Sequence, residues 1–315
     1  MLIPLIILIT SIIGLLLSSE IIIKSLRKIA RHFNISELLI GITVVAIGTS
    51  LPEVATNISA GFKKASGVAI GNIVGSNITN ICLLLGMAGL FSMLFMNEKT
   101  KKREGRMIVI AVVLMLFAFL DFKISQLEGA ILILVYIIYL IYVYIQEKRL
   151  KKIKVKGRHP AIRLWFWIPS AIIGFIALIF SSNYTVNSAI SLAQLWGIPQ
   201  TIIGIFIIGI GTSLPELTVI LQGIRKRAKG LSIGTLIGSN ISNPLLALGS
   251  GAIITGYSIS KNIVKFDMIF LLIVTIIALF FLERHDSFDK KRAAFLIALF
   301  AFYVYMRLFV INGVF

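Results

Sequence analysis

Two glutamates occur in identical hexapeptides, each inside a long apolar stretch. Residues 48–53 and 211–216 both read Gly-Thr-Ser-Leu-Pro-Glu. In a membrane-spanning segment, a carboxylate at mid-depth costs about 3 kcal/mol or more even on insertion scales. The remaining acidic residues lie near the ends of the apolar stretches or in loops. We therefore predict that Glu53 and Glu216 serve a function at membrane depth, which a purely structural membrane protein would not need.

The proline of each hexapeptide predicts a break in the helix that frees backbone oxygens. Pro52 and Pro215 lack a backbone donor and displace the carbonyl about one turn earlier, near Gly48 and Gly211. Free carbonyls at membrane depth are tolerated only where protein, water or an ion satisfies them. The neighbouring threonine and serine add hydroxyl oxygens. This combination suits a cation.

A second polar cluster follows each hexapeptide, at residues 71–80 and 234–243. Ser76 and Asn80 are four residues apart, as are Ser239 and Asn243, so each pair can share one helical face toward the glutamates. For any one of these side chains, helix-helix hydrogen bonding is the alternative interpretation. Carboxylate, amide, hydroxyl and carbonyl oxygens together favour a hard cation, Ca²⁺ or Na⁺, over Zn²⁺ or Cu²⁺.

Both clusters belong to an internal repeat. Residues 41–80 align without a gap to residues 204–243, with 19 identities in 40 positions and a constant offset of 163. With five predicted spans in each half, the two copies enter the membrane from opposite sides. Such inverted repeats build secondary transporters, in which the substrate lies near the bilayer midplane.

The composition predicts an all-α polytopic membrane protein and excludes a soluble enzyme. Of 315 residues, 58% are hydrophobic and only 14% are charged, and the mean hydropathy is +0.98. Hydropathy predicts ten transmembrane helices. They cover residues 2–23, 36–60, 68–95, 107–121, 126–146, 163–182, 198–222, 231–257, 264–282 and 293–312.

The positive charges predict the orientation. The net charge is +18, and 25 of the 31 Lys and Arg fall in one of the two alternating sets of loops. The positive-inside rule then places the 147–162 loop in the cytoplasm and both termini outside the cell membrane. This pattern accounts for the basic residues without a nucleic-acid partner. We expect a first five-helix repeat at 1–146, a cytoplasmic basic linker at 147–162 and a second repeat at 163–315.

The paired GTSLPE and GxxxGSNxxN segments resemble the two alpha repeats of the cation/Ca²⁺ exchanger superfamily, specifically the prokaryotic sodium/calcium exchangers. The resemblance implies antiport of three Na⁺ against one Ca²⁺ by alternating access. We expect Ca²⁺ and Na⁺ as transported substrates and membrane lipid as a partner, with no cofactor, no nucleic acid and no obligatory protein partner. The charges agree with this stoichiometry, because two carboxylates balance one Ca²⁺ whereas three Na⁺ leave one positive charge. Exchange at this ratio would be electrogenic.

The resemblance also implies roles for individual residues. Glu53 and Glu216 would be shared by Ca²⁺ and Na⁺, and the carbonyls of Thr49 and Thr212 would complete the calcium position. Outer sodium positions would use serines of the two clusters and two nearby carbonyls, which here are Ser50, Ser76, Ser213, Ser239, and the carbonyls of Ala46 and Gly209.

Two positions depart from the family pattern. Asn243, followed by Pro244, stands where the family usually has an aspartate that contributes to K⁺ binding in its potassium-dependent branch. This argues against K⁺ dependence. Thr235 stands where an asparagine is common, as Asn72 is in the first repeat. Both departures leave H⁺ open as a coupling ion.

The alternative is therefore a Ca²⁺/H⁺ antiporter on the same fold, although the GNxxE-type motifs usual in that branch are absent here. Cation channels generally show rotational rather than inverted symmetry at the filter. An intramembrane enzyme would need a nucleophile and a base, or metal-binding histidines, and no histidine falls at membrane depth. We predict that the protein is not an enzyme.

Overall fold

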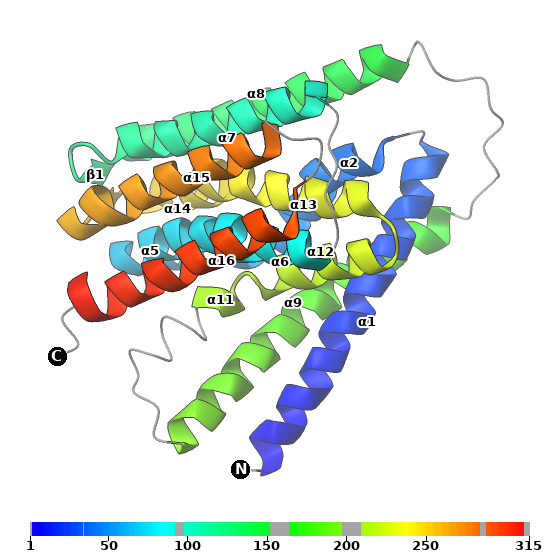
Figure 1. The fold of residues 1–315 in the computed structure, drawn as a ribbon, viewed down its shortest axis with the longest axis horizontal. Helices are drawn as coiled ribbons and strands as arrows, with labels where there is room; N and C mark the ends of the chain where they lie inside the picture. The colour runs from blue at the N-terminus through cyan, green and yellow to red at the C-terminus, as the bar shows by residue number, and fades with distance from the viewer. Residues whose placement is uncertain are drawn as a thin grey trace.

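The computed structural model describes residues 2–33, 35–91, 98–151, 164–196, 209–283 and 288–311, and almost all of them are helical (Figure 1). Several helices contain short π-helical segments, labelled η. The first half comprises α1 (Leu2–His32), α2 (Glu37–Ile40), η1 (Gly41–Val45), α3 (Ala46–Thr49), α4 (Leu51–Phe62), α5 (Ser66–Ile78), η2 (Thr79–Leu84), α6 (Leu85–Phe91), α7 (Glu98–Ala118) and α8 (Gln126–Lys151). The second half comprises α9 (Leu164–Leu195), α11 (Gly209–Gly211), α12 (Leu214–Arg225), α13 (Lys229–Ser242), η4 (Asn243–Ala247), α14 (Leu248–Thr255), η5 (Ile263–Asp267), α15 (Met268–Glu283), α16 (Lys290–Tyr305) and η6 (Met306–Ile311).

The prediction of a helical, polytopic membrane protein is confirmed. Seven continuous helical segments in the described part of the chain are long and apolar enough to cross a membrane, and a bent pair, α2–α3 with α4, raises the number to eight. The other two predicted spans coincide with α7 and with α11–α12, and residues 198–208 lie outside the described residues. The count of ten stays a prediction.

Helix α9 is longer than the hydropathy indicates. The predicted span ends at residue 182, but the helix continues to Leu195. The reason is that the polar residues after position 180 pack against α1, where the Thr185 hydroxyl donates to Ser11 Oγ at 2.9 Å. Figure 1 shows α1 and α9 running side by side, with the end that carries the N-terminus projecting away from the other helices. A polar run that is satisfied by a neighbouring helix does not end a transmembrane helix.

The two repeats meet where glycine allows close backbone contact. A Cβ atom at Gly41 would lie 2.8 Å from the Cα of Gly234, and a Cβ at Gly234 would lie 2.5 Å from the carbonyl oxygen of Leu38. Any larger side chain would therefore force α13 away from α2 and η1. These glycines place the second polar cluster of one repeat directly against the first segment of the other.

The repeats also share local geometry. Lys64 and Arg227, which are equivalent under the offset of 163, both have a positive φ, of 54° and 56°. Lys64 lies in the turn between α4 and α5, and Arg227 lies in the turn between α12 and α13. An equivalent backbone hydrogen bond closes each turn, from Ala65 N to Ala60 O at 2.8 Å and from Ala228 N to Gly223 O at 2.7 Å. The sequence duplication is therefore also a duplication of local structure. The inverted orientation of the copies, and the division at 146 and 162, stay predictions, because only residues 147–151 of the linker are described and these belong to α8.

A short antiparallel ladder, which the sequence did not predict, joins the two halves at one end. Strand β1 (Lys123–Ile124) pairs with β2 (Tyr257–Ser258). The buried Tyr257 hydroxyl donates to the Asn57 carbonyl of α4 at 2.7 Å. This contact ties the second half of the chain to the helix that carries Glu53.

Candidate ion-binding site

Both glutamates lie just after a break in a helix. Ser50 (φ −83°, ψ 4°) separates α3 from α4, and the helices before and after it meet at 43°. Ser213 has nearly the same conformation (φ −90°, ψ 7°) between α11 and α12. Pro52 and Pro215 stand at the start of the second helix of each pair, where the missing N–H costs no helical hydrogen bond. Each break places the following glutamate in the first turn of a helix.

The two carboxylates are buried together. Glu53 and Glu216 are both 0% exposed and interact electrostatically. The Ser50 hydroxyl donates to Glu216 Oε1 at 3.3 Å. Among the described residues, neither oxygen of Glu53 nor Oε2 of Glu216 has a hydrogen-bond partner. Two like charges buried without partners are costly, and a cation between them would offset this cost.

Side chains of one repeat contact those of the other around the glutamates. Ser76 Oγ lies 3.4 Å from Thr212 Oγ1, and Asn80 Nδ2 donates to Ser239 Oγ at 3.5 Å. The predicted hydroxyl and amide groups from both halves of the chain are thus brought to one buried location.

The asparagines that end the two polar clusters lie in π-helical segments. Asn80 belongs to η2 and Asn243 begins η4. Both are 0% exposed. In the described part of the chain, Asn80 Oδ1 and both polar atoms of the Asn243 amide lack a hydrogen-bond partner. π-Helical turns occur often at functional sites, where they rotate side chains out of the regular register. These amides can supply oxygen to a buried ion.

The two carbonyls suggested as sodium ligands differ in their surroundings. The Ala46 carbonyl accepts hydrogen bonds from Ser50 N at 3.0 Å and from Thr49 Oγ1 at 3.3 Å. In the second repeat, Ser213 N donates to Ile210 O at 3.1 Å, one residue beyond the equivalent Gly209. The Gly209 carbonyl therefore does not receive the bond that its counterpart receives.

Two residues near the site were missed from the sequence. Ser242 Oγ lies 3.1 Å from Ser50 Oγ, and Asn57 Nδ2 donates to the Glu53 carbonyl at 2.9 Å. Ser242 was recognisable in principle, because Thr79 places a hydroxyl at the equivalent position of the first repeat. Asn57 carried a weaker signal, its spacing of one helical turn from Glu53.

Comparison with known proteins identifies the family. The family model described as "sodium/calcium exchanger protein" matches residues 3–145 and 166–309. The chain belongs to the sodium/calcium exchanger family. This confirms the resemblance found in the sequence and makes the protein a member of a family of membrane transporters for Na⁺ and Ca²⁺. The two matched ranges flank the predicted basic linker.

Relatives and solved structures agree with this family. Sodium/calcium exchanger MaX1 of Methanosarcina acetivorans is 29% identical over 93% of this chain and 97% of its own. Inner membrane protein YrbG of Escherichia coli is 31% identical over 84% of this chain and 85% of its own. A solved structure of the sodium-calcium exchanger NCX_Mj, soaked with Na⁺ and Sr²⁺, superimposes with a TM-score of 0.84 at 28% identity and covers 98% of this chain and 99% of that one.

Proposed function

We propose that this family member is a secondary active antiporter that exchanges three Na⁺ for one Ca²⁺ by alternating access, without enzymatic activity or a cofactor. The observation that carries the proposal is the buried pair Glu53 and Glu216, contributed by equivalent helix breaks of the two repeats. Three of the four carboxylate oxygens have no hydrogen-bond partner in the described part of the chain. Two such carboxylates neutralise one Ca²⁺.

The other ligands proposed for the ions surround this pair. Ca²⁺ takes six to eight oxygen ligands, so two carboxylates need help from neutral oxygens. We assign the calcium position to Glu53, Glu216 and the carbonyls of Thr49 and Thr212. The sodium positions would use the remaining candidates, which are Ser50, Ser76, Ser213, Ser239, Asn80, Asn243 and the carbonyls of Ala46 and Gly209.

Competition for shared ligands would couple the two ions. An empty site holds two uncompensated buried charges, and this disfavours the conformational change that carries the site across the membrane. Either Ca²⁺ or Na⁺ removes that penalty. The transport cycle with the lowest energy barrier is then the one in which the site crosses the membrane with Ca²⁺ in one direction and with Na⁺ in the other. Exchange of three Na⁺ for one Ca²⁺ moves one net positive charge per cycle.

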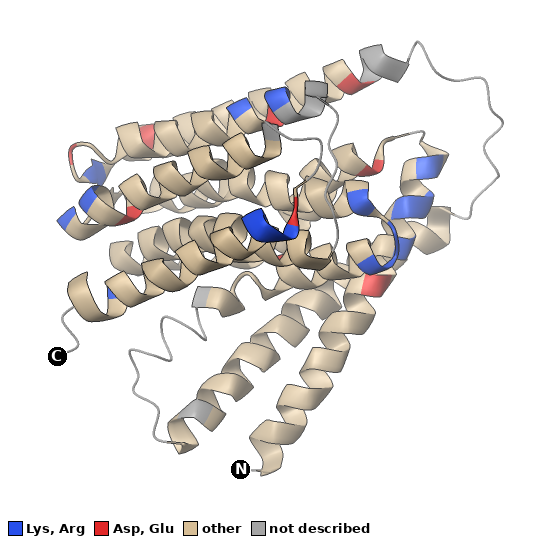
Figure 2. Cartoon of the chain, in the orientation of Figure 1, with Lys and Arg blue, Asp and Glu red and all other residues tan. Residues whose placement is uncertain are grey.

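The arrangement in the membrane belongs to the same proposal. We place the protein in the cell membrane as ten helices in two inverted five-helix repeats, with both termini outside and the 147–162 loop in the cytoplasm. The charge distribution supports this orientation, because Lys and Arg gather where α1 and α12 end (Figure 2). The long shafts of the helices are almost free of charge in the same view.

Radiolabelled Ca²⁺ uptake into proteoliposomes tests the transport proposal. The vesicles are loaded with Na⁺ and diluted into Na⁺-free medium, with separate arms for a pH gradient and for added K⁺. Glu53→Gln removes one site carboxylate, and Glu147→Gln makes the same chemical change at a half-buried position near the end of α8. Uptake should follow the outward Na⁺ gradient, ignore K⁺, survive in the Glu147 variant and disappear in the Glu53 variant.

Two further readouts separate the finer claims. With valinomycin and inward K⁺, an inside-positive potential should accelerate uptake, because a 3:1 cycle exports one positive charge per Ca²⁺ taken up. If the pH gradient alone drives uptake, the protein is a Ca²⁺/H⁺ antiporter and the coupling ion proposed here is wrong. Ca²⁺ flux without any counter-ion would refute the coupling mechanism.

A further inference from the structure

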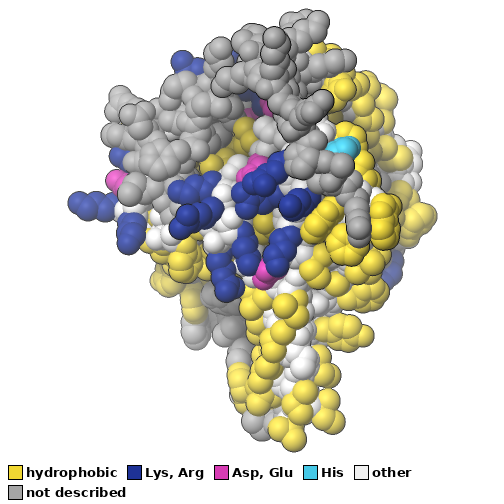
Figure 3. Space-filling view, turned by 90° about the vertical axis from the view of Figure 1, so that its right-hand side faces the viewer, with side chains coloured by type: hydrophobic (Ala, Val, Ile, Leu, Met, Phe, Trp, Pro, Cys, Tyr) yellow, Lys and Arg dark blue, Asp and Glu magenta, His cyan; other side chains and the backbone are white. Residues whose placement is uncertain are grey.

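A cavity of about 360 Å³ opens at the basic end of α1, away from the candidate ion site. Its lining comes from three segments that are distant in sequence. The cavity is lined by Lys24, Arg27, Lys28 and Arg31 of α1, Trp167 of α9 and Lys226, which follows α12. Figure 3 shows a face of the molecule on which Lys and Arg side chains gather, with a few acidic groups among them.

Acidic neighbours fix some of these cations in place but do not neutralise the cluster. Glu20 Oε1 receives both Lys24 and Lys226, each at 2.7 Å. Arg27 pairs with Glu37 at 2.6 Å, and its Nη1 donates to the Lys226 carbonyl at 3.0 Å. Two carboxylates, of Glu20 and Glu37, therefore form ion pairs with three cations.

The two remaining cations are available. Lys28 and Arg31 are exposed, and neither forms an ion pair within the described residues. The cavity therefore keeps an excess of positive charge. The positive-inside rule needs basic residues on one side of the membrane, but it does not require them to converge on one cavity.

An apolar surface continues directly from the cavity along α1. Ile13, Leu17 and Ile21 are 50%, 58% and 40% exposed. Their spacing places them on the same helical face as Lys24 and Lys28. The beginning of α9 adds exposed aromatic side chains, with Trp165 73% exposed. Figure 3 shows this apolar surface beside the basic one.

We propose that this cavity binds the phosphate of an anionic phospholipid whose acyl chains lie along the apolar face of α1. Lys and Arg bind phosphate by charge and hydrogen bonds, and a tryptophan at the boundary is typical of the lipid headgroup level. Free inorganic phosphate has the same charged group but no chains. The apolar face adjoining the cations is the reason to assign a lipid.

The position of the lipid would matter for the molecule. Arg27 and Lys226 already connect α1 to the end of α12, and α12 carries Glu216 in its first turn. A headgroup held by cations of both segments adds a bridge between the α1–α9 pair and the helix of the candidate site. The binding proposal itself does not depend on which ions are exchanged.

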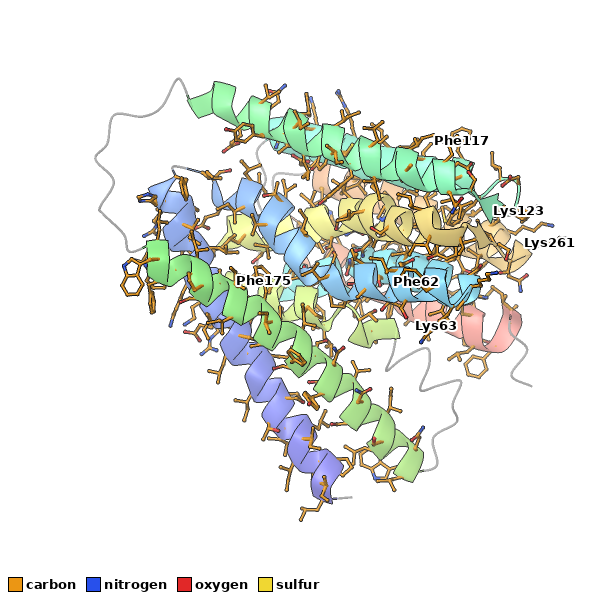
Figure 4. The ribbon with its side chains drawn as sticks, turned by 180° about the vertical axis from the view of Figure 1, so that it is seen from behind. Phe62, Lys63, Phe117, Lys123, Phe175 and Lys261 are labelled. Carbon is orange, nitrogen blue, oxygen red and sulfur yellow. The ribbon has the colours of Figure 1, made fainter. Side chains whose placement is uncertain are left out.

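Lipid titration of the purified full-length protein in detergent, followed by native mass spectrometry, tests the inference. Phosphatidylglycerol is compared with phosphatidylcholine of the same chains and with inorganic phosphate. The test variant is Lys28→Gln with Arg31→Gln. The matched control is Lys123→Gln with Lys261→Gln, which removes the same charge at exposed positions near the opposite end of the molecule (Figure 4).

Phosphatidylglycerol should bind in preference to phosphatidylcholine, and its affinity should fall with salt. Each Lys or Arg near an anionic headgroup contributes about a fivefold factor, so the test variant, which loses two of them, should bind about 25-fold more weakly. The control variant should be unchanged. Equal loss in both variants, or no preference between the lipids, would overturn the proposal. Inorganic phosphate that displaces the lipid at equal concentration would show a free-anion site instead, and would also refute it.

A second measurement needs no charge variant and guards against misfolding. Phosphatidylglycerol with brominated chains should quench tryptophan emission more strongly than brominated phosphatidylcholine does. Trp167 lines the cavity and Trp165 lies on the adjoining apolar surface, so the double variant Trp165→Phe with Trp167→Phe should remove this difference between the lipids, while quenching at Trp196, beyond the other end of α9, persists. If the difference remains in the double variant, the lipid binds elsewhere and the assignment is wrong.

Discussion

Glu53→Gln should separate the stability of the protein from its affinity for Ca²⁺. Both carboxylate oxygens of Glu53 are buried without hydrogen-bond partners in the described part of the chain, and Glu216 lies close by. Without Ca²⁺, glutamine removes one of two uncompensated buried charges. The variant should then be at least as stable as the unsubstituted protein in Ca²⁺-free buffer.

The expected loss of Ca²⁺ affinity is large. Removing one partner of a buried charge pair costs about 3–5 kcal/mol, which corresponds to roughly 150-fold to 5,000-fold weaker binding. At a Ca²⁺ concentration 100 times its Kd, binding stabilises a protein by about 2.7 kcal/mol. At the same concentration the variant would gain less than about 0.4 kcal/mol, because its site would be at most about half occupied.

Thermal unfolding in detergent, titrated from chelator to excess Ca²⁺, measures both quantities. The unsubstituted protein should gain about 5–11 °C in Tm, because each kcal/mol of stabilisation raises the Tm of a mid-sized domain by about 2–4 °C. Glu147→Gln should behave like it. A Glu53→Gln variant that keeps the Ca²⁺-dependent rise would show that Glu53 is not a calcium ligand. A variant that is much less stable without Ca²⁺ would show that this carboxylate is structural.

Three further substitutions test particular contacts. Gly234→Ala should lower stability by about 1–3 kcal/mol in thermal unfolding, because its Cβ would lie 2.5 Å from the Leu38 carbonyl oxygen. The control Gly67→Ala, where a Cβ meets no described atom within 4 Å, should have no such cost. Equal losses of stability in the two variants would contradict the packing argument. Tyr257→Phe should lower the free energy of unfolding by about 1 kcal/mol, because it loses the 2.7 Å hydrogen bond to α4. An unchanged Tm would show that this hydrogen bond does not stabilise the protein. Asn243→Asp should tighten Ca²⁺ binding about tenfold by adding a nearby negative charge; isothermal titration showing unchanged affinity would place this side chain away from the ion.

The parts of the site that were predictable from sequence carry strong local signals. A proline inside an apolar helix and a charged group at membrane depth are both costly, so Pro52 and Glu53 point to a broken helix with a functional carboxylate. The repeat made the second copy predictable as well. Its offset of 163 recurs in the structure as the hydrogen bond from Asn77 Nδ2 to the Asn240 carbonyl, at 3.5 Å.

Other features depend on tertiary contacts that no local pattern encodes. The polar sequence of the second half of α9 predicts a loop. It is helical in the structure, where its Thr185 hydroxyl donates to Ser11 of α1. The pairing of Lys123 with Ser258 joins loops from opposite halves of the chain. The basic residues Arg27 and Lys226 look like ordinary topogenic charges, and only the fold shows that they meet at one cavity.

The duplicated site is not symmetric in detail, and this asymmetry bears on the proposed mechanism. Ser50 of the first repeat donates to Glu216 of the second. The equivalent bond, from Ser213 to Glu53, is not made. The Ser213 hydroxyl and both carboxylate oxygens of Glu53 lack hydrogen-bond partners among the described residues. If the repeats are inverted, exchanging their conformations generates the state that opens to the other side of the membrane. The transported ions would then bind the same set of ligands from either side of the membrane. The contact between Ser50 and Glu216 would be replaced by the equivalent contact between Ser213 and Glu53.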